Sequence, residues 1–158
     1  MNPKIVTLAR LASILKRSPR KKTVFTNGCF DILHYGHVKY LREAKSKGDI
    51  LIVGLNSDRS TQRLKGKNRP INTQKDRAFV LASLESVDYV VVFDEETPYR
   101  LIRSIEPDVL VKGGDWPRQK IVGADVVLAR GGRVLTIPYV KNRSTTDLIR
   151  RIIRKTKT

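Results

Sequence analysis

The chain lacks the features of membrane-spanning and disulfide-bonded proteins. Among its 158 residues there is one cysteine, Cys29, so no disulfide can form within the chain. Its uninterrupted apolar runs, such as residues 90–93, have the length of a strand and fall far short of a membrane span. Residues 1–22 contain no apolar segment followed by a small-residue cleavage site, so we expect no secretory signal and a cytoplasmic location.

Aromatic and acidic residues are also scarce. Aromatics make up 6% of the chain. They do not form the stripe of alternating aromatic and basic residues that is typical of proteins that bind single-stranded nucleic acid. The 15 acidic residues face 32 lysines and arginines, a formal net charge of +17. This charge favours a polyanionic partner: nucleic acid, an anionic membrane face or phosphorylated small molecules. The basic residues cluster at 16–22 and 150–157, where a solvated surface is the simplest interpretation.

The apolar pattern alternates between strand and helix periods. Short apolar runs predict five strands, at residues 23–25, 49–55, 87–93, 109–111 and 133–137. Apolar residues three and four apart, with capping residues, predict helices at residues 7–16, 35–47, 73–86, from 97, 122–129 and 144–153. This alternation predicts one α/β domain over residues 1–158, a Rossmann-like five-stranded parallel sheet with helices on both faces. Residues 1–22 would add an N-terminal helix and a basic segment.

Three helix starts carry recognisable capping residues. Asn72 or Thr73 can cap the helix that runs to about residue 86. Thr97 is predicted as an N-cap, because the following proline suits the first helical position. Ser144, with Asp147 three residues later, forms a capping-box arrangement.

A candidate phosphate site follows the first predicted strand. The segment 26–37 reads TNGCFDILHYGH, and a helix begins within it. Free amides and the helix dipole favour an anion where a strand feeds a helix N-terminus. Gly28 and Gly36 allow close approach of a ligand to the backbone. His34 and His37, the only histidines of the chain, can donate hydrogen bonds to phosphate oxygens.

Two other interpretations of this segment remain open on the residues alone. The histidines can be ordinary polar residues beside a turn. Histidines three apart are also a zinc-ligand pattern. With no third histidine and only Cys29 as a soft ligand, we predict no protein metal site.

Residues 28–37 resemble the signature of the cytidylyltransferase-like branch of the nucleotidyltransferases, whose hallmark is His-x-Gly-His. The likeness runs from about residue 23 to 153 and includes Asn-Ser-Asp at 56–58, Lys-Gly-Gly-Asp at 112–115 and Ser-Thr-Thr at 144–146. Within this branch the chain is most similar to the adenylyltransferases that make ADP-heptose from ATP and heptose 1-phosphate. The resemblance implies a homodimeric enzyme of carbohydrate metabolism, in lipopolysaccharide core synthesis, that uses ATP with Mg²⁺ and a sugar 1-phosphate.

The same resemblance implies roles for individual residues. His34, His37 and Lys65 would be catalytic. Those expected to contact the nucleotide and its phosphates are Thr26, Asn27, Gly28, Cys29, Phe30, Gly36, Lys112, Gly113, Ser144, Thr145 and Thr146. Those expected to bind the acceptor are Asp31, Asn56, Asp58, Arg69, Arg77 and Asp115.

Ordinary structural roles compete with several of these assignments. Asn56 and Asp58 can form a turn that caps the next helix, and Arg77 can form a surface salt bridge. Lys65 and Arg69 can belong to a solvated loop. A CTP-dependent enzyme acting on glycerol 3-phosphate or another polyol phosphate is the alternative within the same fold. A basic nucleic-acid-binding protein is the alternative class, and we expect neither nucleic acid nor membrane as a main partner.

Overall fold

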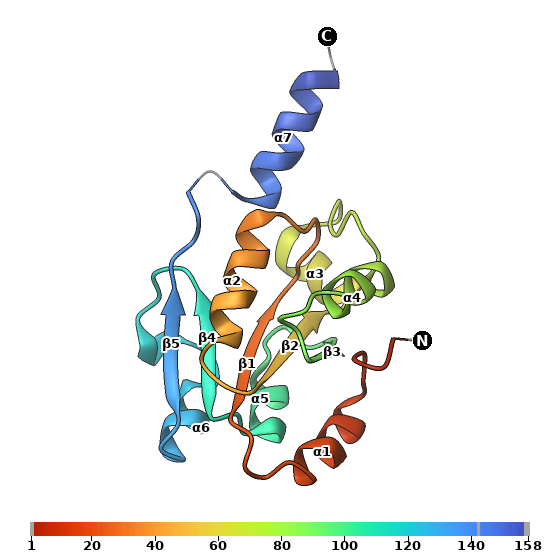
Figure 1. Cartoon of the computed structure of the whole chain (residues 1–158). Helices are drawn as coiled ribbons and strands as arrows, with labels where there is room; N and C mark the ends of the chain where they lie inside the picture. Colours follow the sequence, from red (N-terminus) through yellow and green to blue (C-terminus); the bar gives the residue numbers. More distant parts are fainter. Residues whose placement is uncertain (1, 142, 157–158) are drawn as a thin grey trace.

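The computed structural model describes residues 2–141 and 143–156 (Figure 1). Its five strands form one fully parallel sheet in the order β3-β2-β1-β4-β5, which confirms the predicted Rossmann-like α/β fold. The strands are β1 (Thr23–Gly28), β2 (Ile50–Asn56), β3 (Tyr89–Phe93), β4 (Val109–Gly113) and β5 (Arg133–Ile137).

The helices of the described chain alternate with these strands. They are α1 (Leu8–Lys16), α2 (Tyr35–Lys45), α3 (Asp58–Lys65), α4 (Gln74–Ala82), α5 (Tyr99–Ile105), α6 (Ala124–Ala129) and α7 (Thr145–Thr156), with a 3₁₀ turn at Arg118–Lys120. Within the described ranges, none of the helices is long and apolar enough to cross a membrane.

The sheet is covered on both faces, as predicted. Side chains alternate across β2, so Leu51 packs on one face and Ile52 on the other. The face of Leu51 carries the buried side chains of α2 and α4, including Leu41 and Leu81. The opposite face is covered by α1, α5 and α6, with Leu11 among the fully buried residues.

Three helix predictions need correction. Residues 58–65 form α3, although they were expected to be a turn and a loop. The N-cap position of α5 is Pro98, with no side-chain cap bond, so the Thr97 cap is wrong. Helix α6 begins at Ala124, not at 122, because Gly123 has φ +84° and no room for a Cβ beneath Ile102.

Strands β1 and β4 separate toward their carboxyl ends. β1 pairs with β2 along its whole length, but its pairing with β4 stops at Phe25–Leu110. The Tyr40 hydroxyl occupies the opening, 2.6 Å from Thr26 Oγ1 and donating to the Val111 carbonyl at 3.2 Å. The chain reverses its direction of sheet growth between these strands, and ligands of open α/β sheets bind at such a point.

Candidate active site

The two histidines meet at the start of α2, beside the carboxyl end of β1. His34 is the N-cap of this helix, and its Nδ1 accepts a hydrogen bond from the Gly36 amide at 3.1 Å. An accepting Nδ1 carries no proton, so the neutral His34 ring carries its proton on Nε2 and can donate it. The His37 ring stacks on His34, with centroids 3.9 Å apart and planes at 27°.

His37 is held in a mainly apolar setting. The Phe30 ring meets it edge-on at a centroid distance of 5.3 Å. Among the described residues, His37 Nδ1 is a buried side-chain atom with no hydrogen-bond partner. Such an atom is costly unless a ligand or water satisfies it. The imidazole is therefore the one side chain of this loop with an unused polar atom in the interior.

Both histidines are uncharged near neutral pH. Burial lowers the pKa of His37 to about 4, with a further contribution from His34, while the Ile32 carbonyl opposes the shift. Burial, followed by the positive charge of Arg143, also lowers the pKa of His34. The pair can therefore supply hydrogen-bond donors to a phosphate, while positive charge must come from other side chains.

The start of α7 lies against the start of α2 (Figure 1). A Cβ added to Gly36 would lie 3.1 Å from His34 Nδ1 and 3.3 Å from the Arg143 Cβ, so the two segments are in contact. Thr145 Oγ1 reaches the Ile32 carbonyl at 3.5 Å. Ser144 Oγ accepts from the Asp147 amide, which is the first bond of the predicted capping box, and it donates to the Asp147 carboxylate. Two helix N-termini, both favourable for anions, thus converge on the histidines.

The carboxyl end of β4 supplies a second set of polar groups. Lys112 Nζ donates to Asn27 Oδ1 at 3.4 Å, which joins the ends of β4 and β1. Burial lowers the pKa of Lys112; Cys29 counteracts this shift, and the charge of Lys65 adds to it. Lys65 is exposed at the end of α3, and Lys112 is partly buried.

Tyr139 lies on the backbone of the Gly113–Gly114 segment. A Cβ at either glycine would come within 2.8 Å of the Tyr139 ring, and Gly114 has φ +97°. A Cβ at Gly114 would also lie 3.4 Å from the Trp116 indole nitrogen. The neighbouring Asp115 is exposed. The glycines therefore permit close approach, as predicted, but the group that approaches them is an exposed tyrosine from the loop after β5.

Gly28 and Thr26, both expected to contact the nucleotide, are covered by side chains of the protein itself. The Phe30 ring covers Gly28, where an added Cβ would meet it at 3.0 Å. Phe30 itself has φ +44°, in the left-handed region. The Thr26 side chain is fully buried and bonded to Tyr40. These residues therefore support the shape of the loop that follows β1.

Four of the residues predicted to bind the acceptor, Asp31, Asp58, Arg69 and Arg77, belong to one network of hydrogen bonds and ion pairs. The Asp31 carboxylate is buried and accepts from Arg69 Nε at 2.6 Å and from the Ile71 and Asn72 amides. These hydrogen bonds and the Arg69 charge lower the Asp31 pKa despite the opposing effect of burial, which is the largest contribution. Asp31 therefore holds the loop that precedes α4 against the loop that follows β1.

Arg77 is the largest fully buried side chain of the described chain. It donates to the Cys29 and Asn72 carbonyls and forms an ion pair with Asp58 at 2.8 Å. With 0% side-chain exposure, it has no surface to offer to a substrate or to a surface salt bridge. This burial corrects both sequence interpretations and makes Arg77 a support behind the site.

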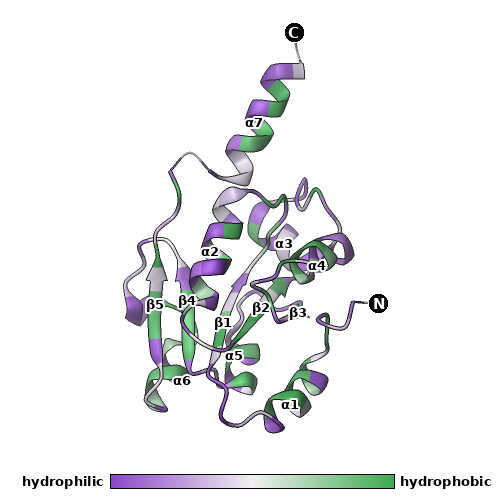
Figure 2. Cartoon of the chain, in the orientation of Figure 1, coloured by the Kyte–Doolittle hydropathy of each residue, from purple (hydrophilic) through white to green (hydrophobic). Residues whose placement is uncertain are grey.

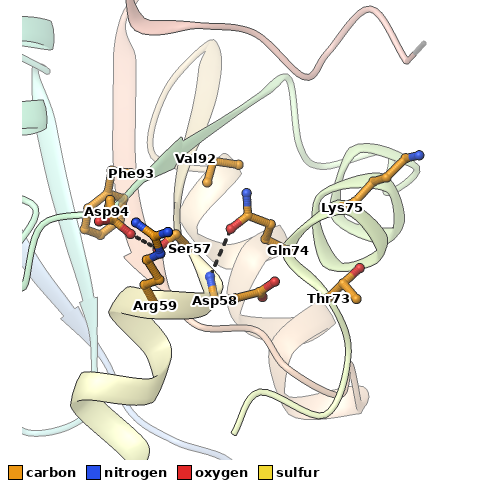
Figure 3. Close-up of a pocket in the computed structure, with 9 residues that line it drawn as sticks. All are labelled: Ser57, Asp58, Arg59, Thr73, Gln74, Lys75, Val92, Phe93 and Asp94. Atoms are coloured by element: carbon orange, nitrogen blue, oxygen red, sulfur yellow. Dashed lines mark hydrogen bonds between the residues drawn. The ribbon is translucent and has the colours of Figure 1, made fainter.

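A hollow of about 610 Å³ lies beside this network, between the starts of α3 and α4 (Figure 3). Asp58 is the only predicted site residue that lines it, and its backbone amide bonds to Gln74 Oε1. Asn56 is buried nearby and donates to Ser60 Oγ. The hollow lies at the ends of β2 and β3, whereas the histidines lie at the opening between β1 and β4.

Tyr40, Tyr139 and Arg143 lie beside the candidate site, although sequence reasoning did not assign them to it. Tyr139 and Arg143 lie in the loop that follows β5, and a position after a strand's carboxyl end was the usable signal. Tyr40 lies inside α2, where an aromatic residue on a helix looks like ordinary core.

Comparison with known proteins agrees with this geometry. The cytidylyltransferase-like family model matches residues 25–151, which include both histidines and the start of α7. The chain belongs to the cytidylyltransferase-like family. Among the described residues, no three histidine, cysteine, aspartate or glutamate side chains cluster as a metal site would require.

Several members of this family are closely similar to the chain. The bifunctional protein HldE of Geobacter metallireducens is 55% identical over 153 residues, covering 96% of this chain and 31% of that protein. HldE of Wolinella succinogenes is 62% identical over 136 residues, covering 86% and 28%. The chain thus spans about a third of the length of these relatives.

Two solved structures have a similar fold. The lipopolysaccharide core biosynthesis protein of Thermoplasma volcanium matches with 31% identity and a TM-score of 0.60, covering 77% of this chain and 98% of that one. Pantoate-beta-alanine ligase of Francisella tularensis matches at 18% identity with a TM-score of 0.61, over 95% of this chain and 78% of that one. The latter likeness is one of fold.

Proposed function

We propose that the chain is an adenylyltransferase that joins AMP from ATP to a heptose 1-phosphate and releases pyrophosphate. The observation that carries this proposal is the stacked histidine pair at the start of α2, which faces the start of α7 at the opening between β1 and β4. The identity of 55% and 62% to HldE proteins supports the choice of ATP and heptose 1-phosphate.

The proposed reaction is a direct in-line displacement. An oxygen of the sugar phosphate attacks the α-phosphorus of ATP, a new P–O bond forms, and the bond to the pyrophosphate leaving group breaks. A phosphate monoester is largely dianionic at neutral pH, since its second pKa is about 6, so the nucleophile needs no general base. Catalysis then depends on positioning and on stabilising charge in the transition state.

Each group in the site has a task in this reaction. His34 Nε2–H and the neutral His37 ring donate hydrogen bonds to the α-phosphate and its bridging oxygen. Lys65 and Lys112 supply the positive charge that the neutral histidines lack, opposite the β- and γ-phosphates. The amides at the start of α7, with Thr145 and Thr146, form the second phosphate cradle.

We expect Mg²⁺ to arrive with ATP, bound to its phosphate oxygens. The described carboxylates do not form a magnesium site of their own, since Asp31 and Asp58 are already paired with arginines. We therefore assign no protein ligand to the metal and route no step through it.

The acceptor sugar is proposed to lie on the open side of the Asp31 network. Asp58 and Asp115 retain solvent-exposed oxygens that can accept from hydroxyls, and Arg69 keeps part of its guanidinium exposed. Arg77 holds Asp58, and Asp31 holds Arg69. The homodimer expected from the resemblance remains part of the proposal and is checked by light scattering.

Pyrophosphate release is the test of this proposal. Purified protein with Mg²⁺ is offered ATP or CTP, each with heptose 1-phosphate or glycerol 3-phosphate. Release with ATP and heptose 1-phosphate alone is expected. Release only with CTP and glycerol 3-phosphate would keep the site and overturn the substrates, whereas no release in any pairing would contradict the activity.

A further inference from the structure

Helix α7 extends away from the body of the molecule (Figures 1 and 2). Over its full length, which the structure describes from Thr145 to Thr156, no side chain is buried. Ile152 and Ile153 are each 50% exposed. Most amphipathic helices bury their apolar stripe on the core, and this one leaves the stripe of its last two turns in solvent.

The helix is divided into an apolar face and a cationic face. Leu148, Ile149, Ile152 and Ile153 are spaced at three and four residues and therefore share one side. The opposite side carries Arg150, Arg151, Arg154 and Lys155. The helix has one acidic residue, Asp147, which is engaged with the Ser144 cap.

Three kinds of occupant could cover the apolar face. A second α7 would bury on the order of 300 Å² per partner from these four side chains, against about 800 Å² in a stable interface. Nucleic acid would satisfy the arginines and leave the isoleucines in water. An anionic bilayer surface satisfies both faces, because apolar side chains enter the boundary of the acyl chains while cations remain among the headgroups.

We propose that α7 lies in the surface of an anionic phospholipid membrane and attaches the protein to it peripherally. The short apolar runs of the sequence predict no membrane partner, because none could span a bilayer. A helix that lies in the membrane surface does not have to span it. The net charge of +17 adds long-range attraction to the same surface. The contact uses the last turns of α7 and leaves Ser144–Thr146 clear for phosphates.

Flotation of the full chain with lipid vesicles tests this proposal without any nucleotide, so its outcome is independent of the proposed enzymatic activity. We expect binding to vesicles of phosphatidylcholine mixed with phosphatidylglycerol, and none to phosphatidylcholine alone. Ile152→Ser with Ile153→Ser should reduce the bound fraction at least about tenfold with the charge unchanged. Arg150→Gln with Arg154→Gln should reduce binding about fivefold for each cation removed.

The matched control removes an apolar pair of similar exposure from another helix. Phe79 and Val80 of α4 are 58% and 47% exposed, and Phe79→Ser with Val80→Ser should bind as the wild type does. Circular dichroism checks the fold of each variant, and Ile153→Ser alone serves if the double variant unfolds.

Three results would overturn the proposal. The first is a wild-type protein that does not bind the anionic vesicles. The second is equal binding by wild type and Ile152→Ser/Ile153→Ser, which would indicate adsorption by charge alone. The third is a dimer in light scattering that this variant converts to a monomer, with no vesicle binding, which would assign the face to a second copy.

Discussion

At the scale of single residues, the unusual feature is a pair of stacked imidazoles that are both uncharged. Burial lowers the pKa of His37 to about 4. The Nδ1 atom of His34 caps α2 by accepting a hydrogen bond from the Gly36 amide. The arrangement leaves His34 Nε2–H able to donate, while His37 Nδ1 is buried without a hydrogen-bond partner among the described residues. Hydrogen-bond donors fixed in advance toward a developing negative charge stabilise a transition state, and the nearby lysines add the positive charge that the histidines lack.

Replacement of His37 by alanine is expected to lower turnover at least about a hundredfold, which corresponds to about 3 kcal/mol for one lost donor. The far-ultraviolet circular dichroism should be unchanged. Lys39→Ala, at an exposed position two residues further along α2, is the control and should retain activity. Near-normal turnover in His37→Ala would remove the residue from the mechanism.

The depressed pKa of His37 also predicts how stability depends on pH. The unfolded ring takes up a proton near pH 6.5, whereas the folded ring stays neutral until about pH 4. The free energy of unfolding should therefore fall as pH drops from 6.5 to 4, by up to about 3 kcal/mol from this group. Urea unfolding of wild type and His37→Gln at several pH values measures this pH dependence. If the free energy of unfolding falls equally with pH in both proteins, the lowered pKa of His37 is refuted.

At the scale of secondary-structure elements, Arg77 is the connection between three segments. It reaches from α4 to the loop after β1, to the loop before α4 and to the first residue of α3. The loop after β1 leads directly into His34. Removal of this side chain would leave the Asp58 carboxylate without its ion pair and the Cys29 and Asn72 carbonyls without this donor.

Arg77→Met is expected to lower the free energy of unfolding by about 2–3 kcal/mol, because the bonds of a buried guanidinium are lost while the Asp58 carboxylate, 35% exposed, can still be hydrated. Arg100→Met removes an arginine that is 84% exposed and paired with Glu95, and should cost less than about 1 kcal/mol. Urea denaturation of both variants makes the comparison. Equal losses would mean that burial of Arg77 contributes nothing.

Sequence reasoning located most elements because their apolar residues keep a clear period. It missed α3, since the segment DRSTQRLK has one aliphatic residue and no apolar stripe. This helix depends on the Ser57 cap and on Ser60, buried and bonded to Asn56. It also could not assign Arg77, because an ion pair between residues 19 positions apart exists only after α3 and α4 have packed.

At the scale of the whole molecule, strand order brings together residues that are far apart in the chain. The loop after β1, the end of β4 and the start of α7 meet because β4 inserts beside β1. The sequence motifs predicted this meeting through the rule for carboxyl ends of parallel strands. They did not predict the outward direction of α7, since amphipathic spacing is the same for a helix that packs and one that does not.

Transfer of a labelled α-phosphorus tests the central claim most directly. Protein, Mg²⁺, heptose 1-phosphate and ATP radioactive at the α-position are incubated, and the products are separated by chromatography. We expect label in a sugar nucleotide, unlabelled pyrophosphate, and at least about a hundredfold slower formation of the labelled product with His37→Ala. Label that stays in ADP, with a doubly phosphorylated sugar as the other product, would show transfer of the γ-phosphate and contradict the account.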